Sequence, residues 1–276
     1  MFYKDGILTR SDILNIPGVR HGFSSREGGV SALPHTASLN LSDNLGDPPE
    51  VVRQNRDIFA RAVSDSLCGG GATVSAHQIH SSRVRLLTRE NAGEGYDRPA
   101  GEDGDGFVTA EPFVMPIIRT ADCVPILFAG RRPDGSPVVA AVHAGWRGTV
   151  AGIAAEAVRR MEALGCGRET IRAAVGAHIG FCCYEVGEDF VEAIREARGT
   201  AFAERHVRAV EGSPAGSRPH ADLTGMNLEI LAEAGIGASR VDVSPACTMC
   251  DEAHYSHRRM KGVRGVMGAG IVICAD

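Results

Sequence analysis

Three side chains of the types that bind transition metals lie next to short apolar segments of this chain. Cys123 follows residues 114–119 and His143 follows residues 138–142, and both segments are apolar and contain β-branched residues. Such segments are typical of buried strands. His80 comes shortly after residues 73–76, whose alternating pattern predicts another strand that delivers this side chain from the same side of a sheet.

One thiolate and two imidazoles suit zinc or copper and leave one coordination position free for catalysis. However, the long separations between His80, Cys123 and His143 do not form a compact metal-binding motif. A buried cysteine is often a small core residue. The residues alone therefore leave open both a metal site and a structural role.

Several motifs resemble those of the YfiH-like family, in the same order and over nearly the whole chain. They include residues 25–31, 38–41, 77–80, 105–109, 120–125, 143–148, 182–187 and 256–259. The family has been described as multicopper polyphenol oxidoreductase (laccase domain), as peptidoglycan editing factor and as purine nucleoside phosphorylase. The resemblance implies that His80, Cys123 and His143 bind Zn²⁺, with Cu²⁺ as the alternative metal. Ser81 departs from the family pattern, in which a glycine commonly follows the first histidine ligand.

The segment after His143 also predicts an anion site. A helix that starts near Gly148 would expose free backbone N–H groups, and Arg147 would add a bidentate guanidinium that suits phosphate. A structural ion pair of Arg147 is the alternative. By resemblance, Arg26 and Asn40 are candidates for binding ribose or phosphate, although alone each is typical of a turn.

A wall of the substrate pocket is expected from the segment 182–187. Cys182, Cys183 and Tyr184 are predicted to line the pocket without binding the metal, and packing of one cysteine is the structural alternative. Cys247 and Cys250, followed by His254 and His257, form a C-x-x-C pattern. This pattern leaves two interpretations open, a second metal site and a loop that shapes another wall.

The resemblance implies a zinc-dependent purine nucleoside phosphorylase whose partners are phosphate and adenosine, inosine or S-methyl-5′-thioadenosine, with adenosine deamination as a further activity. One alternative is a hydrolase or amidase of peptidoglycan precursors, with Cys123 as nucleophile and His143 as base. Copper-dependent polyphenol oxidation and a non-enzymatic fold around structural zinc are the others. Structural zinc usually has four protein ligands, and the resemblance supplies three.

Composition limits the class of protein. The 276 residues carry a net charge of −5 and no run of more than two adjacent basic residues such as Arg258-Arg259, which argues against a nucleic-acid partner. There is no apolar run of about 18 residues and no signal peptide, so a cytoplasmic protein away from the membrane is expected. In that compartment the eight cysteines are expected to be thiols.

The periodicities predict a mixed α/β (α+β) chain with one catalytic domain over residues 1–276. Helices are expected at residues 48–62, 149–164, 187–197 and 223–234, and further strands at 19–23, 171–175 and 264–274. Residues 91–106 are predicted to form an exposed polar loop. The family resemblance implies an α-β-β-α layered sandwich with mixed sheets.

Overall fold

The computed structural model describes residues 1–65, 72–212, 214 and 216–274. The α-helices of these residues are α1 (Pro49–Ser64), α2 (Trp146–Val150), α3 (Ile153–Ala163), α4 (Glu188–Arg198), α5 (Thr200–His206) and α6 (Leu223–Glu233). Short 3₁₀ helices are η1 (Asp12–Leu14), η2 (Arg89–Asn91), η3 (Arg168–Thr170) and η4 (Ala238–Arg240). The strands are β1 (Phe2–Asp5), β2 (Leu8–Ser11), β3 (Val19–Ser24), β4 (Ala72–Val74), β5 (Val84–Leu86), β6 (Gly106–Thr109), β7 (Val114–Thr120), β8 (Val124–Arg131), β9 (Pro137–Ala144), β10 (Arg172–Val175), β11 (Val207–Arg208), β12 (His220–Ala221), β13 (Val241–Val243) and β14 (Met267–Ile273).

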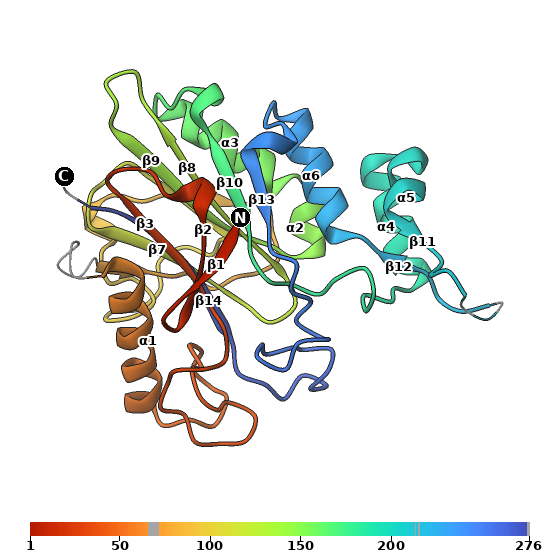
Figure 1. Cartoon of the computed structure of the whole chain (residues 1–276), viewed down its shortest axis with the longest axis horizontal. Coiled ribbons are helices and arrows are strands. Elements are labelled where there is room, and N and C mark those ends of the chain that lie inside the picture. Colours follow the sequence, from red (N-terminus) through yellow and green to blue (C-terminus); the bar gives the residue numbers. More distant parts are fainter. Residues whose placement is uncertain (66–71, 213, 215, 275–276) are drawn as a thin grey trace.

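Two mixed six-stranded sheets form the centre of the described structure (Figure 1). The first has the order β1-β2-β3-β14-β7-β4, and the second has the order β13-β10-β8-β9-β6-β5. The pairs β4–β7, β5–β6 and β10–β13 are parallel, whereas the other pairs within these sheets are antiparallel. The predicted mixed α/β fold with mixed sheets is therefore confirmed.

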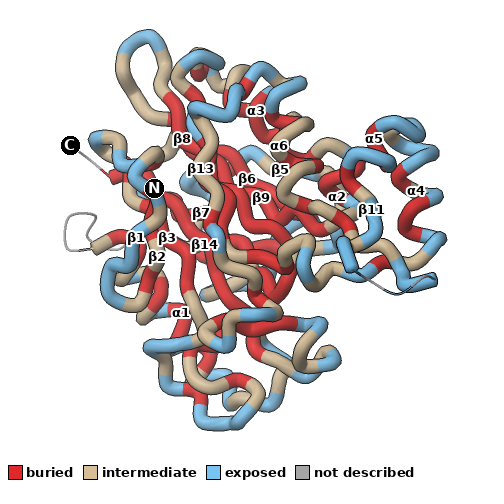
Figure 2. Tube along the Cα trace, turned by 45° about the vertical axis from the view of Figure 1, so that its right-hand side comes forward, coloured by how far each residue is buried: buried red, intermediate tan, exposed pale blue. Residues whose placement is uncertain are grey.

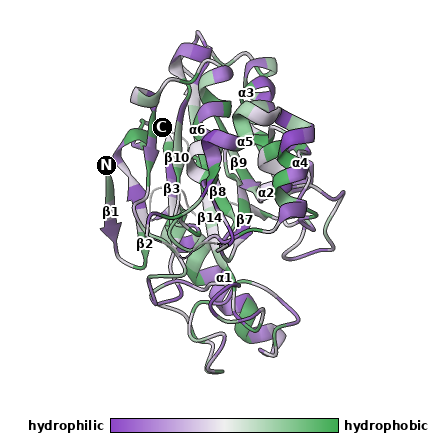
Figure 3. Cartoon of the chain, turned by 90° about the vertical axis from the view of Figure 1, so that its right-hand side faces the viewer, coloured by the Kyte–Doolittle hydropathy of each residue, from purple (hydrophilic) through white to green (hydrophobic). Residues whose placement is uncertain are grey.

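Three apolar layers hold these elements together. Residues such as Phe23, Ile118 and Val139 fill the space between the two sheets. Phe59 of α1 packs on the outer face of the first sheet with Ile117. The third and largest layer lies between the second sheet and α2, α3, α4, α5 and α6. The strands are largely buried in Figure 2, and β8 and β9 are mostly hydrophobic in Figure 3, whereas α1 and α4 carry polar residues on their outer faces.

The last strand, β14, lies in the middle of the first sheet. It pairs with β3 on one side, where Gly270 lies opposite Gly22, and with β7 on the other, where Gly268 lies opposite Arg119. A Cβ atom at Gly268 would lie 2.5 Å from Leu41 and 3.1 Å from Phe59. The glycines of this strand therefore allow α1 and the loop before it to pack closely on the sheet.

One predicted helix is divided in two. The sequence predicts a continuous helix over residues 149–164, but α2 ends at Val150 and α3 begins at Ile153. Gly152 has φ +80°, a left-handed conformation that interrupts helical geometry and that glycine adopts at low cost. The helical spacing of the apolar residues continues across this break, which is why periodicity alone predicts one helix.

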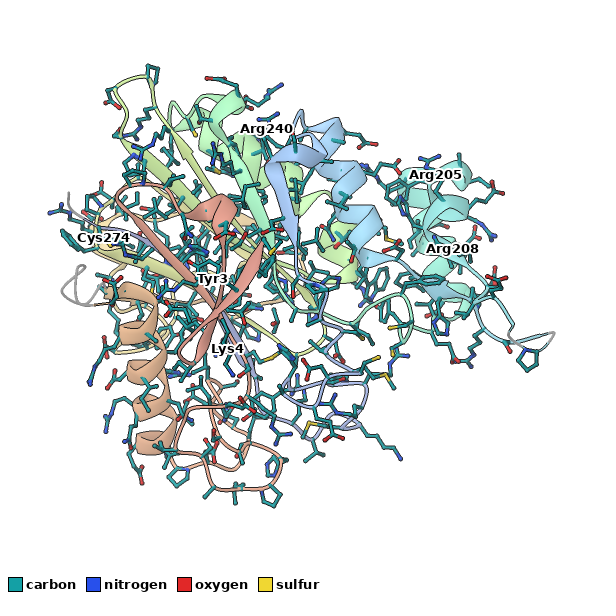
Figure 4. The ribbon with its side chains drawn as sticks, viewed as in Figure 1. Tyr3, Lys4, Arg205, Arg208, Arg240 and Cys274 are labelled. Atoms are coloured by element: carbon teal, nitrogen blue, oxygen red, sulfur yellow. The ribbon has the colours of Figure 1, made fainter. Side chains whose placement is uncertain are left out.

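The expectation that all cysteines are thiols is wrong at Cys274, which is disulfide-bonded. This residue follows β14 (Figure 4). Cys123, Cys166, Cys182, Cys183, Cys247 and Cys250 are free. On the opposite side of Figure 4, Arg205 and Arg208 mark the outlying unit formed by α4, α5, β11 and β12. None of the described helices has the length and hydropathy needed to span a bilayer.

His21 in β3 is expected to make stability depend on pH. Burial, together with the charge of Arg10, lowers the pKa of His21 from 6.5 to about 3. Its Nε2 accepts a hydrogen bond from the Ser11 N–H (2.9 Å), so the folded chain holds the neutral ring. Below pH 6.5 the unfolded chain binds this proton, and the free energy of unfolding should approach a loss of about 1.4 kcal/mol per pH unit. Equilibrium unfolding between pH 7 and 4 should show a shallower slope for His21→Gln; parallel curves would contradict this assignment.

Candidate metal centre

His80 lies in the loop between β4 and β5. The side chain of Gln78 fixes this loop to β7, because its amide nitrogen donates to the Arg119 carbonyl and its oxygen accepts from the Arg119 N–H, both at 2.8 Å. His80 itself has φ +61°, an uncommon conformation for a residue other than glycine. β4 pairs with β7 in parallel within the first sheet, so His80 and Cys123 follow strands that end at the same edge of that sheet, as predicted. His143 belongs to β9 of the second sheet, so the prediction does not extend to this residue.

Cys123 and His143 are brought together by strand pairing. Cys123 lies in the turn between β7 and β8, where Asp122 has φ +93°. In the antiparallel pair β8–β9, Val124 lies opposite Ala144 and Pro125 opposite His143. The strand register therefore places the thiol next to the imidazole. His143 lies inside β9 rather than after it, because this strand continues to Ala144.

The potential ligand atoms of His80, Cys123 and His143 all lie within 4.8 Å of one another. The Cys123 Sγ is 3.9 Å from the His80 Nε2, and the two imidazole rings meet edge to face with centroids 4.9 Å apart. Donors that share one zinc ion at about 2.0 to 2.3 Å each lie roughly 3.3 to 3.8 Å apart in tetrahedral geometry. The cluster therefore fits one such ion with small adjustments. His80 is exposed and His143 is buried, so the open side of the cluster faces solvent near His80.

Asp105 organises both histidines, a role that its sequence context does not predict. Its carboxylate receives a hydrogen bond from the His143 Nδ1 at 2.8 Å, which leaves Nε2 of that ring for the cluster. It also accepts from the N–H groups of His80 (2.9 Å) and Ser81 (2.7 Å) and from the Ser81 hydroxyl (2.7 Å). Ser81, the departure from the family pattern, thus adds a donor to this carboxylate. A carboxylate that orients a histidine ligand is a common support of metal sites.

The charges of the cluster favour an ionised pair in the metal-free chain. Burial opposes charge on the Cys123 thiol, but His143 and His80 lower its pKa to about 6. Burial also opposes protonation of His143, but the Cys123 thiolate and Asp105 raise the pKa of this ring to about 9. Despite its burial, the hydrogen bonds from His143 and Ser81 hold the pKa of Asp105 at about 2. A metal ion would replace the proton of His143 and find the thiolate already formed.

Gly145 allows the cluster to close. A Cβ atom at this position would lie 2.7 Å from the His80 Cδ2 and 3.4 Å from both the Cys123 Sγ and the His143 Cε1. Any side chain at this position would push His80, Cys123 and His143 apart. Gly148 is similarly restricted, because a Cβ atom there would lie 2.6 Å from the Ser81 carbonyl oxygen. Gly145 and Gly148, which flank the predicted anion-binding residue Arg147, therefore serve the close packing around the cluster.

Tyr184 lies close enough to Cys123, Arg147 and Arg258 for the charge of each to affect its hydroxyl. The exposed Arg147 lies over the ring of Trp146 with its Cζ 4.2 Å from the centroid, and no carboxylate of the described residues pairs with it. Arg258 lies over the ring of Tyr184 at 5.4 Å. Burial, together with the Cys123 charge, raises the pKa of Tyr184 to about 12, so its hydroxyl is protonated at neutral pH. Tyr184, Arg147 and Arg258 thus supply a hydroxyl and two cations near the cluster.

Two other predicted contacts have structural partners. The buried Asn40 donates to Asp47 (2.8 Å) and to the Ser42 carbonyl (2.9 Å), and its oxygen accepts from Val266 N–H (3.1 Å). Arg26 donates to the Ala37 carbonyl (2.8 Å) and lies over a tyrosine ring. Both side chains hold the loop between β3 and α1 through these contacts, and their binding of ribose or phosphate stays a prediction.

The cysteines of the predicted pocket wall are not part of the His80–Cys123–His143 cluster. Cys182 and Cys183 meet Cys247 and Cys250 in a second group, separate from His80, Cys123 and His143. His254 pairs with Asp251 at 3.0 Å and is not in this group. A cavity of about 900 Å³ beside α1, lined by Arg53, Arg119 and others, also contains none of the three ligands.

The chain is similar to known proteins over nearly its whole length. Residues 20–274 match the family described as multi-copper polyphenol oxidoreductase laccase. The chain belongs to this family. It is 38% identical over 265 residues to a purine nucleoside phosphorylase of Deinococcus radiodurans, covering 96% of this chain and 92% of the relative. It is 32% identical over 251 residues to adenosine deaminase RL5 of an unknown prokaryotic organism, covering 90% and 91%.

The fold of this laccase-family chain is similar to that of a solved relative. The crystal structure of the Bacillus licheniformis hypothetical protein YfiH superposes with a TM-score of 0.85 at 30% identity, covering 99% of this chain and 98% of that one. The predicted membership of the YfiH-like family is thereby confirmed. Both of these relatives are named as enzymes, one as a purine nucleoside phosphorylase and the other as an adenosine deaminase.

Proposed function

We propose that this laccase-family chain is a zinc-dependent purine nucleoside phosphorylase, with residues 1–276 acting as one cytoplasmic catalytic domain. Its substrates are phosphate and adenosine, inosine or S-methyl-5′-thioadenosine. The observation that supports this most directly is the His80–Cys123–His143 cluster, which has three donors of the types that zinc binds and an open side. The relative named purine nucleoside phosphorylase adds the substrate class.

In this reaction, a phosphate oxygen forms a bond to C1′ of the ribose while the bond from C1′ to the purine nitrogen breaks. The purine leaves with the electron pair and takes a proton, which gives free base and ribose 1-phosphate. Bound zinc would supply Lewis-acid polarisation or an acidified water at the open position. Arg147 and Arg258 attract phosphate, and the protonated hydroxyl of Tyr184 donates a hydrogen bond to the nucleoside.

Adenosine deamination is the second candidate, supported by the relative named adenosine deaminase. Incubation of the zinc-loaded chain with adenosine, with and without phosphate, separates the two reactions. We expect adenine and ribose 1-phosphate only when phosphate is present. Inosine formed at the same rate without phosphate would show a deaminase, and no nucleoside turnover would contradict both proposals. Oxidation of a phenol by copper-loaded but not zinc-loaded protein would favour the oxidase alternative.

Arg147→Ala is expected to raise the KM for phosphate about tenfold or more, since a hydrogen bond to a charged group contributes roughly 1.5 to 3 kcal/mol. The KM for adenosine should change much less, and metal content should remain the same. Initial rates with each substrate varied in turn measure this difference.

Arg159→Ala is the matched control, because it removes the same charge from an exposed arginine that pairs with Glu156 on α3. This control should leave both KM values unchanged. An equal rise in the two KM values of Arg147→Ala would indicate a purely structural role of this arginine.

A further inference from the structure

A second group of potential metal ligands consists of thiols alone. The sulfur atoms of Cys182, Cys183, Cys247 and Cys250 all lie within 4.8 Å of one another. The Cys250 Sγ is 3.3 Å from the Cys183 Sγ and 3.7 Å from the Cys182 Sγ. Tetrahedral zinc with bonds of about 2.3 Å to four sulfurs requires sulfur separations of roughly 3.8 Å. The observed spacing is therefore close to that of a four-thiolate metal site.

Hydrogen-bonded turns hold the backbone around these cysteines. Cys247 and Cys250 are joined by a tight turn in which the Cys250 N–H donates to the Cys247 carbonyl at 3.1 Å. The Cys247 Sγ also accepts a hydrogen bond from the Gly180 N–H at 3.2 Å. The Cys183 N–H donates a hydrogen bond to the Gly180 carbonyl at 3.0 Å. Two turns from distant parts of the chain thus present their thiols to a common centre.

We propose that Cys182, Cys183, Cys247 and Cys250 bind one thiophilic divalent metal ion, with zinc as the metal. This site is separate from the His80–Cys123–His143 cluster and does not depend on the proposed enzymatic activity. His254 and His257 are not ligands of it. Four protein ligands close the coordination sphere, which is typical of a structural rather than a catalytic site.

The metal would clamp two loops that form the rim of the catalytic cluster. The loop after β10 carries Tyr184, and the loop after β13 carries Arg258, whose guanidinium donates to the Glu185 carbonyl at 3.0 Å. Asp122, next to Cys123, accepts from the Thr248 hydroxyl (2.6 Å) and the Arg258 N–H (2.7 Å). Fixing the two loops at the cysteines would therefore also fix Tyr184 and Arg258, the side chains proposed above to contact the substrate.

The test uses the full chain with Cys123→Ala, because this variant removes a ligand of the first site. Under reducing conditions, elemental analysis should find one zinc per chain, and titration with Co²⁺ should produce intense thiolate-to-cobalt absorption. Adding Cys182→Ser, Cys183→Ser, Cys247→Ser or Cys250→Ser should each lower zinc affinity at least tenfold in competition with a chromophoric chelator. Cys166→Ser, at a free cysteine outside the group, should leave zinc and cobalt binding unchanged.

The absence of zinc and cobalt binding in folded Cys123→Ala, with its fold checked by circular dichroism, would overturn the proposal. So would a loss of affinity in only two of the four serine variants, since the site would then not have four thiolate ligands. Disulfides between these cysteines that persist under the reducing conditions would likewise overturn it. None of these results depends on nucleoside turnover, so the catalytic proposal can fail while this one stands.

Discussion

Cys123→Ala is expected to remove the metal from the catalytic cluster and to lower kcat/KM for adenosine phosphorolysis at least about 100-fold, which corresponds to about 3 kcal/mol. The substitution removes the one negatively charged ligand and leaves His80 and His143 to hold the ion. Metal content and activity should fall together. Metal analysis and initial rates on the same preparation measure both quantities.

Cys166→Ala is the matched control, because Cys166 is also a free thiol and lies near Thr170 rather than near the cluster. Its metal content and kcat/KM should equal those of the wild type. The informative contrary result is a wild-type chain that remains active after its metal is removed while Cys123→Ala is inactive. Cys123 would then be a nucleophile beside the His143 base, as the hydrolase alternative requires.

Asp105→Asn is expected to weaken metal binding about 10- to 100-fold, the usual effect of removing the group that orients a histidine ligand. The amide would keep one acceptor oxygen and turn an NH₂ group toward donors that now share the carboxylate, including the His80 and Ser81 N–H groups. Each buried donor left without a partner costs roughly 1 to 3 kcal/mol. The free energy of unfolding should therefore fall as well, even without metal.

Asp103→Asn is a closely matched control, because Asp103 also contacts a histidine, His77, at 3.3 Å, but both side chains are exposed. Competition with a chelator and chemical unfolding should show little change for this variant. Equal effects of the two substitutions would mean that metal binding is weakened by removal of a negative charge rather than by loss of the hydrogen bonds of Asp105.

The sequence pointed to His80, Cys123 and His143, because each lies beside an apolar strand and the family resemblance implies the same three residues, although the residues alone left a structural role open. The sequence did not indicate the role of Asp105, because this residue lies near the end of a polar segment that is predicted to be an exposed loop. The role of this carboxylate depends on β6 pairing with β9, where Gly106 lies opposite Val142, and this pairing has no local signal. An aspartate directly before a buried strand within a family motif is the feature that could have indicated it.

For the four cysteines, the sequence indicated the residues but not the contacts among them. The sequence pointed to Cys247 and Cys250 through their spacing and to Cys182 and Cys183 as a pocket wall. Their meeting depends on β10 and β13 being parallel neighbours, because the loops after both strands then leave the same edge of the sheet. Since that pairing joins distant parts of the chain, local spacing indicated histidines as partners of Cys247 and Cys250 instead.

The central position of β14 has a consequence for how the enzyme matures. β7, which leads directly to Cys123, lacks one of its two neighbouring strands until β14 inserts between it and β3. During synthesis on the ribosome, the first sheet is therefore incomplete between β3 and β7 until β14 has emerged. Contacts between such distant segments form slowly and leave strand edges open to aggregation. We expect ribosome-bound chains that lack β14 to be sensitive to protease and unable to retain zinc at the catalytic cluster.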